Sequence, residues 1–501
     1  MRANLHKYSG RYYSMSKRNL LLSAVAIAAF STPAQADTLR EALVSAYQTN
    51  PTLAGAQAQQ RATDENVVIA KADGRPSSGT SFTYQENFLR NANSFTAPRR
   101  QASAGGEVSV PVYSGGRVKY AVRSAETRVV AGQYDLRATE ASLFSNVVAV
   151  YMDVMRDEAV VELNRANVGV LSVNLEATGD RFEIGDLTRT DVAQSEARLE
   201  VARGELETAR ANLISSKENY IALVGNPPGD LEPPPPLPNL PETPDEAVDI
   251  ALQYNPDLLA AKERSEAAEI DIKTARGAVK PTVEAYVQGS YVNFLDSLGG
   301  NVPGADLVQE QSDAQAGVRL SVPIYQGGRP AAQVRQAQAR SGQAYEQLIE
   351  VERSVIAQTR AAFSSWRASE RVIQSSERAV AASALSLEGV RAENSVGNRT
   401  ILDILNAEQE LLNAQVQLVT ARRNSYVAGF TLLAAMGRAE ARDLGLDGGV
   451  LYDPQVNYER VKDQFYDFQT DPNPEPQATR TVNTPAQTAE VPPLPDPTVQ
   501  E

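Results

Sequence analysis

The residue types that catalysis and metal binding most often use are nearly absent from this sequence. There is no cysteine, and the one histidine is His6. The chain beyond it therefore has no thiol nucleophile, imidazole base, disulfide or Cys/His metal site. Catalysis by carboxylates is the chemistry still to be considered, because the chain has 62 Asp and Glu residues, more than its 48 Lys and Arg. We expect no enzyme, no cofactor and no metal.

The placement of the acidic residues argues against a hydrolase with paired carboxylates. Most of them lie on predicted helix faces beside Lys and Arg, as the solvated surface of a coiled coil requires, and no pocket-forming motif accompanies them. The net charge of −14 also argues against a nucleic-acid partner, because phosphate binding needs clustered basic residues.

Two short segments, 188–191 and 400–403, place a threonine three residues before an aspartate. In such a pair each side chain can bond the other residue's backbone N–H at the start of a helix. Gly185 and Gly397 come just before, where a preceding helix would end with a positive φ. The pattern predicts two tight turns between helices, and the carboxylates can serve a second role at the same time.

Residues 1–36 have the pattern of a secretory signal peptide. The segment is basic without an acidic residue, and an apolar run over 20–30 precedes a small-x-small cleavage site at 34–36. The apolar run is shorter than the ~20 residues that a membrane-spanning helix needs. We expect an exported protein, translated from Met1 or from Met15.

The rest of the chain contains one plan twice. The sequence TNPTL at 49–53 recurs as YNPDL at 254–258, and VPVYSGGR at 110–117 recurs as VPIYQGGR at 322–329. Such landmarks indicate two structural repeats of about 200 residues each. A proline-rich stretch, typical of an extended linker, separates them.

The expected organisation has six parts. They are a signal peptide (1–36), a first repeat of helix, two strands, long helix and helix (37–225), a Pro-rich linker (226–244), a second repeat (245–437), a C-terminal segment (438–470) and a disordered Pro-rich tail (471–501).

Each repeat contains two stretches that alternate like strands. In the first repeat they cover about 79–90 and 102–113. In the second, apolar residues at alternate positions over 314–324 share one face, and Asp313 and Arg319 share the other. An apolar-out, polar-in pattern is typical of a membrane barrel strand, although a half-buried strand of a soluble sheet alternates in the same way.

Long helices with regular seams follow the strands. Apolar residues recur every three or four positions over 143–182, and every seven over 192–220; the second repeat adds an alanine row over 407–435. These seams predict coiled-coil packing, and a helix of more than 60 residues is roughly 100 Å long, enough to cross a wide aqueous space. Asp157 and Asn164 interrupt the first seam, either to specify register or to face water.

Four strands cannot close a membrane barrel, since the smallest closed ones have about eight. The free edges must pair with other chains, and two, three or four copies would close the barrel. The alternative is a soluble periplasmic coiled-coil scaffold or adaptor protein. It explains the signal peptide and the seams, but neither the four strands nor the duplication.

The duplicated plan, the paired VPxYxGGR motifs and the segment VGNRTILDILNA at 396–407 resemble the TolC family of outer-membrane efflux proteins, over about 38–437. The resemblance implies a mainly α fold with a membrane β-barrel part: a homotrimer in which four strands per chain form one 12-stranded barrel above a periplasmic α-helical tunnel. The linker and 438–470 would form an equatorial collar around that tunnel.

The resemblance also implies a function and partners. The protein would be an outer-membrane exit duct for type I protein secretion or multidrug efflux. Its partners would be a periplasmic adaptor (membrane fusion) protein, an inner-membrane ABC or RND-type transporter, and outer-membrane lipid.

In that family, polar links between the hairpins close the periplasmic end of the tunnel. By position, Arg399 would be the gate arginine, linking to Thr190 and Asp191 on the first hairpin. Asn394 stands where the family's gate tyrosine is expected.

Acidic rings line the same constriction in the family. Asp403 would supply the main ring, and Asn406 stands where a second ring aspartate is expected, so a single ring is implied. Gly185 and Gly397 would be the tip glycines where adaptors dock.

Overall fold

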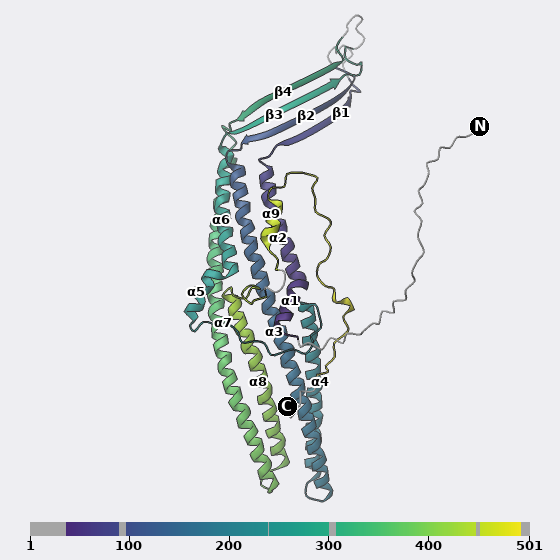
Figure 1. The fold of residues 1–501 in the computed structure, drawn as a ribbon, viewed down its shortest axis with the longest axis vertical. Helices are drawn as coiled ribbons and strands as arrows, with labels where there is room; N and C mark the ends of the chain where they lie inside the picture. The colour runs from purple at the N-terminus through teal and green to yellow at the C-terminus, as the bar shows by residue number, and fades with distance from the viewer. Residues whose placement is uncertain (1–36, 90–96, 239, 300–306, 447–450, 492–501) are drawn as a thin grey trace, which may run out of the picture.

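The computed structural model describes residues 37–89, 97–238, 240–299, 307–446 and 451–491. The expected signal peptide (1–36) lies outside the described residues. The molecule is elongated, with a layer of strands at one end and two long helical hairpins that extend away from it (Figure 1).

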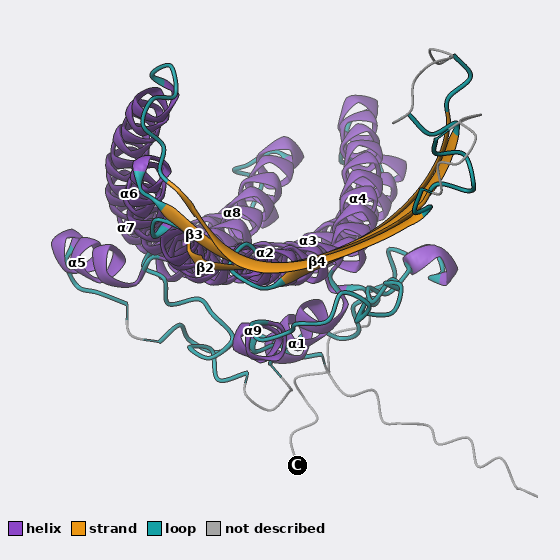
Figure 2. Ribbon diagram, turned by 90° about the horizontal axis from the view of Figure 1, so that it is seen from above, coloured by secondary structure: helices purple, strands orange, loops and turns teal. Residues whose placement is uncertain are grey.

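The strands form one antiparallel sheet in the order β1-β2-β3-β4. They are β1 (Ser77–Glu86), β2 (Arg100–Tyr113), β3 (Thr282–Asn293) and β4 (Glu310–Ser321). Each repeat contributes one hairpin, and β2 pairs with β3 across the repeats. The sheet is strongly curved, with β1 and β4 at its edges (Figure 2). The expected strands are confirmed, with small shifts at their ends.

The register of the sheet confirms the predicted alternation. Glu107 pairs with Gln288, which pairs with Gln315, so a polar row crosses one face. Val108 pairs with Val287 in the next row, on the other face, and both valines are exposed. A continuous exposed apolar face on one side of a polar one is the lipid-facing band of a membrane barrel.

Each repeat supplies two short helices before its strands and a helical hairpin after them. They are α1 (Leu39–Thr49), α2 (Pro51–Ala72), α3 (Arg117–Glu183) and α4 (Arg189–Val224) in the first repeat, and α5 (Pro244–Tyr254), α6 (Pro256–Arg276), α7 (Arg329–Ser395) and α8 (Ile401–Ala435) in the second. Helix α9 (Pro454–Val461) and two 3-10 turns, Gly277–Val279 and Thr481–Asn483, complete the described elements. None of the described helices carries an apolar stretch long enough for a membrane span.

The two longest helices, α3 and α7, have 67 residues each, which is roughly 100 Å at 1.5 Å per residue. Seen from above, α3 and α7 follow the arc of the sheet, and α4 and α8 lie on its concave side (Figure 2). Helices α1, α5 and α9 lie outside that arc, on its convex side. One chain therefore has the shape of a sector of a tube wall.

The repeated Asn-Pro motif begins one short helix in each repeat and fixes that helix to the helical hairpin of the same repeat. Asn50 Oδ1 accepts from Thr52 N–H at 2.9 Å at the start of α2, and Asn50 Nδ2 donates to Leu223 O at 2.9 Å. Asn255 begins α6 in the same way, and its Nδ2 donates to Ala435 O at 2.9 Å. The motif thus joins the start of α2 to the end of α4, and the start of α6 to the end of α8.

The main core lies where the linker and the short helices meet α3. Phe144, Tyr151 and Phe430 are almost completely buried there. Tyr151 Oη lies 2.6 Å from Glu232 O in the linker and 2.9 Å from Asp37 O, and burial raises the pKa of Tyr151. Leucines of the linker cover the same core, so this proline-rich stretch is held in place.

Helix α9 packs on α2 through a buried carboxylate. Asp64 Oδ2 accepts from Asn457 Nδ2 at 2.7 Å, and Asp64 Oδ1 accepts from Gln60 Nε2 at 2.9 Å. Asp64 is fully buried, and that burial raises its pKa. Val461 is also buried, so α9 is fixed by both polar and apolar contacts.

The structure differs from the expected disordered tail over its first part, 471–491. Gln487 N–H donates to Glu218 Oε1 of α4 at 3.1 Å, and Ala489 and Val491 pack against the main core. Glu218 lies more than 200 positions earlier in the chain, so composition alone could not indicate this contact. Residues 492–501 lie outside the described part of the chain.

We expect Gly437→Ala to lower the free energy of unfolding by about 3 kcal/mol. Gly437 follows α8 with φ 71°, and a Cβ there would lie 2.3 Å from Tyr254 O. Thermal or denaturant unfolding followed by circular dichroism measures the change. Gly169→Ala is the control, because Gly169 is helical with open space around it and should unfold at or above the wild-type midpoint.

Candidate functional site at the hairpin tips

Both hairpin tips contain the predicted capping pair. At the start of α4, Thr188 N–H donates to Asp191 Oδ2 at 2.9 Å, and Asp191 N–H donates to Thr188 Oγ1 at 3.3 Å. Thr400 and Asp403 form the same pair at the start of α8, at the same distances. Hydrogen bonds from the threonine hydroxyl and backbone lower the pKa of Asp191 and of Asp403. Both carboxylates therefore stay charged at neutral pH.

The tip glycines are required by backbone conformation. Gly185 and Gly397 have φ of 82° and 83°, and a Cβ on either would meet no atom within 4 Å. Beside them, Ile184 and Val396 are 81% and 69% exposed. Each tip therefore presents a bare apolar side chain directly before its glycine. An apolar residue directly before each turn glycine was the sequence signal for this pair.

The structure places Arg399 against its own hairpin. Its Nε donates to Glu393 Oε2 at 2.7 Å across the turn between α7 and α8, and Asn394 Nδ2 donates to its carbonyl oxygen at 2.7 Å. Among the described residues of one chain, Arg399 makes no hydrogen bond to Thr190 or Asp191. Those two residues lie on the other hairpin tip, which stands apart in Figure 1.

Asn406 forms a contact that the sequence did not indicate. Its Oδ1 accepts from Arg198 Nη2 at 2.8 Å, which links α8 to α4. The side chain at the expected second-ring position thus joins the two hairpins of one chain. The partner could not be inferred, because Arg198 lies more than 200 residues earlier.

Glu408, two positions further, joins three helices. Its carboxylate accepts from Asn174 Nδ2 of α3 at 2.9 Å to each oxygen, and from Arg391 Nη2 of α7 at 2.9 Å. The Glu408 side chain is 4% exposed. A carboxylate this buried is costly unless it is fully paired, so its bonds hold α8 against α3.

A small apolar cluster lies at the same level. Leu405 of α8 packs between α3 and α4 against Leu171, Leu199 and Ala202. Together with the bonds of Asn406 and Glu408, this cluster closes the lower end of α8 onto the first hairpin. We call these three contacts the lower ties.

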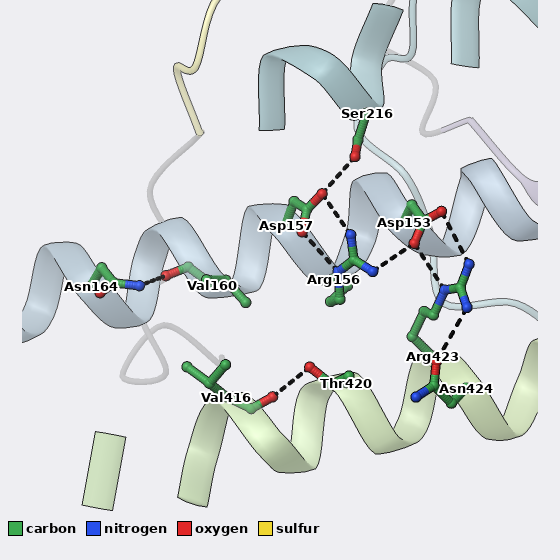
Figure 3. Close-up of polar contacts among 10 residues, drawn as sticks. All are labelled: Asp153, Arg156, Asp157, Val160, Asn164, Ser216, Val416, Thr420, Arg423 and Asn424. Atoms are coloured by element: carbon green, nitrogen blue, oxygen red, sulfur yellow. Dashed lines mark hydrogen bonds and ion pairs between the residues drawn. The ribbon is translucent and has the colours of Figure 1, made fainter. Parts of the chain in front are cut away.

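Further from the tips, charged side chains join α3 and α8 again (Figure 3). Asp153 accepts from Arg423 at 2.9 and 3.1 Å, and from Arg156 Nη1 at 2.7 Å. Arg156 also donates to both oxygens of Asp157, which accepts from Ser216 Oγ of α4 at 2.6 Å. The four charged side chains are 8 to 27% exposed. We call this network the upper tie.

The polar residues of the α3 seam are buried within one chain. Asp157 and Asn164 are each 6% exposed, and Asn164 Nδ2 donates to Val160 O at 2.8 Å. Thr178 is fully buried, with its hydroxyl 3.4 Å from Ser195 Oγ of α4. Asp157 bonds Ser216 of α4, and such a buried polar pair between helices specifies register, whereas the bond of Asn164 stays within α3.

The model of the outer membrane efflux protein family matches residues 42–226 and 247–438. Outer membrane efflux protein BepC of Brucella suis is 34% identical over 456 residues, which cover 90% of this chain and 97% of BepC. Outer membrane protein TolC of Escherichia coli is 27% identical over 469 residues, covering 90% and 92%.

The solved structure of the outer membrane protein VceC of Vibrio cholerae has the same fold, with a TM-score of 0.67 at 24% identity over 80% of this chain and 96% of VceC. The match to the family model covers most of the chain and includes both hairpin tips. This chain is therefore a member of the outer membrane efflux protein family.

Proposed function

We propose that three copies of this chain form a passive exit duct across the outer membrane and the periplasm. The observation that carries the proposal is the direct continuity of a curved sheet, with two unpaired edges, and 67-residue helices that follow its arc. Edge β1 of one copy would pair with β4 of the next. Because the chain belongs to a family of outer membrane proteins, we do not favour the alternative of a soluble periplasmic scaffold.

The bare tips support an adaptor as partner. Ile184 with Gly185, and Val396 with Gly397, present apolar surface at the end of the helices furthest from the sheet. We assign this surface to a periplasmic adaptor protein, which would recruit an inner-membrane ABC or RND-type transporter. That transporter would supply the energy, for type I protein secretion or for multidrug efflux.

Opening of the duct would be a movement of the second hairpin. The lower ties hold α8 to the first hairpin near the tip, and the upper tie holds it further up. Release of the lower ties alone would let the end of α8 swing outward about the upper tie. The gate would thus open without disturbing the core around Tyr151.

Asp403 and Arg399 would act between copies. Three Asp403 carboxylates would form an acidic ring in the constriction, where they concentrate cations. In the closed trimer, Arg399 would exchange Glu393 for Thr190 and Asp191 of a neighbouring copy. The support for this exchange is that Arg399 is half exposed and held by one exposed carboxylate.

We expect Asp403→Asn to lower the cation preference of the purified oligomer in planar bilayers, because the ring loses its charge. The reversal potential under a potassium chloride gradient measures the preference. Asp191→Asn is the matched control, since Asp191 has the same capping bonds in the first hairpin. Equal reversal potentials in wild type and Asp403→Asn would contradict the ring, and failure of every form to conduct, including Arg399→Ala with its tip link removed, would contradict the duct.

Arg399→Ala should raise the single-channel conductance, because the closed tip loses a charged link between copies. Glu393→Gln separates the two partners, since it removes the negative charge of the partner seen within one chain and leaves Thr190 and Asp191 unchanged. If Glu393→Gln raises the conductance as much as Arg399→Ala, the link lies within the hairpin and the proposed exchange is wrong.

Glu408→Leu should raise the conductance and lower the stability by about 2 kcal/mol, because Asn174 and Arg391 lose a charged partner. Glu196→Leu is the control, since Glu196 holds the equivalent position in the first repeat and is exposed. Conductance recordings and thermal unfolding measure the two effects. A Glu408→Leu channel that conducts as the wild type does would remove this tie from the gate.

A further inference from the structure

Three aromatic side chains just beyond α9 are exposed. Phe465, Tyr466 and Phe468 are 56%, 77% and 100% exposed. The rings of Phe465 and Tyr466 meet edge to face, with centroids 6.1 Å apart. Gln469 N–H donates to Tyr466 O at 3.3 Å, so a turn places Phe468 at its apex. We call residues 465–468 the aromatic turn.

The aromatic turn is fastened to the end of α2, next to the sheet. Arg75 donates to Gln464 O and lies 5.4 Å from the centroid of the Phe465 ring. Lys71 Nζ donates to Lys462 O at 2.8 Å. Arg75 is two residues before the first residue of β1, Ser77, so these contacts hold the turn at the helical end of the sheet.

That end of the sheet already carries exposed aromatic residues. Tyr113 ends β2 and is 47% exposed, and Tyr325 follows β4 and is 86% exposed. Ser77 of β1 pairs with Ser109 near the end of β2, so the fastened turn and Tyr113 are at the same rim. Seen from above, α9 lies on the convex side of the sheet, outside its arc (Figure 2).

We propose that the aromatic turn is a membrane anchor that inserts into the periplasmic leaflet of the outer membrane. The inference rests on the membrane position of the sheet, whose exposed apolar face continues into this rim. Aromatic rings prefer the boundary between headgroups and acyl chains, where a ring edge and a polar group can both be satisfied. Asp467, between Tyr466 and Phe468, keeps the insertion at headgroup depth because a carboxylate resists transfer into hydrocarbon.

The placement favours lipid over a second copy of the chain. The turn is fastened beside the helical end of the sheet, and α9, which it directly follows, lies on the convex side of the arc, where the apolar face of the barrel meets lipid. Three aromatic residues with no exposed aliphatic neighbour among residues 462–470 match the composition of an interfacial belt. A contact between copies would bury the rings in protein instead, and the experiment distinguishes the two.

The test uses the full chain with Phe468→Trp as a fluorescent probe. The natural tryptophan, Trp366, is the only one in the sequence and is first replaced by Phe. The oligomer is placed in vesicles of phosphatidylcholine that carry bromine either near the headgroup or near the chain ends. We expect about twofold quenching of the Phe468→Trp probe by bromine near the headgroup, and less by bromine near the chain ends.

Two control probes define what each outcome means. Val318→Trp, on the exposed apolar face of β4, should be quenched. Val482→Trp, which is exposed and lies after the C-terminal segment, should not. A quenched Val318 probe with an unquenched Phe468 probe overturns the anchor and leaves the duct intact. An unquenched Val318 probe overturns the membrane position of the sheet and the anchor with it.

A second variant tests the fastening. Arg75→Ala should reduce quenching of the Phe468 probe towards the level of the Val482 probe, while the Val318 probe stays quenched. If the emission of the Phe468 probe is blue-shifted to the same degree in lipid and in detergent, and bromine has no effect, a second copy covers the turn and the anchor is wrong.

Discussion

The requirement that every backbone hydrogen-bonding group in a membrane be paired sets the form of this protein. An unpaired N–H or C=O in hydrocarbon costs several kcal/mol, and a lone chain has a row of them along β1 and along β4. Curvature turns these edges toward neighbouring copies. Because the strands continue into the long helices, closure of the sheet also brings helices of different copies together. Helix α7 buries far fewer residues than α3 at the same length, which fits a helix whose remaining surface meets another copy.

Polar contacts inside the helix seams lower the stability of the fold but fix the alignment of one helix along another. Transfer of Asp153, Arg156 and Arg423 from water has a desolvation cost that apolar residues of similar size would avoid. Their geometry restores part of that cost, since Arg423 approaches Asp153 with two nitrogens. A slip of α8 by one turn would leave these charges buried and unpaired, so the network selects one alignment. Such selection matters for helices of roughly 100 Å, where apolar seams alone repeat every turn or two.

The sequence predicted what local chemistry determines. Period-two alternation indicated the strand over 102–113, and the Thr-x-x-Asp spacing indicated the caps of α4 and α8. It could not indicate which helix face meets which, because the bonds of Arg198 with Asn406 join positions far apart in the chain. Arg399 shows the opposite limit. Within one chain its guanidinium binds Glu393, only six residues earlier, although the family resemblance had pointed to Thr190 and Asp191 on the other hairpin.

Comparison of the two repeats separates residues needed for the fold from residues specific to one hairpin. The tips share a glycine, a threonine and an aspartate, and helix ends explain all three. They differ at the residue before the threonine, which is Leu187 in one and Arg399 in the other. They differ also in environment, because Glu196 is exposed whereas the equivalent Glu408 is buried against α3. The fold alone requires neither Arg399 nor the burial of Glu408, and both features belong to the second hairpin, which is why we propose that this hairpin, with its turn, is the part that moves.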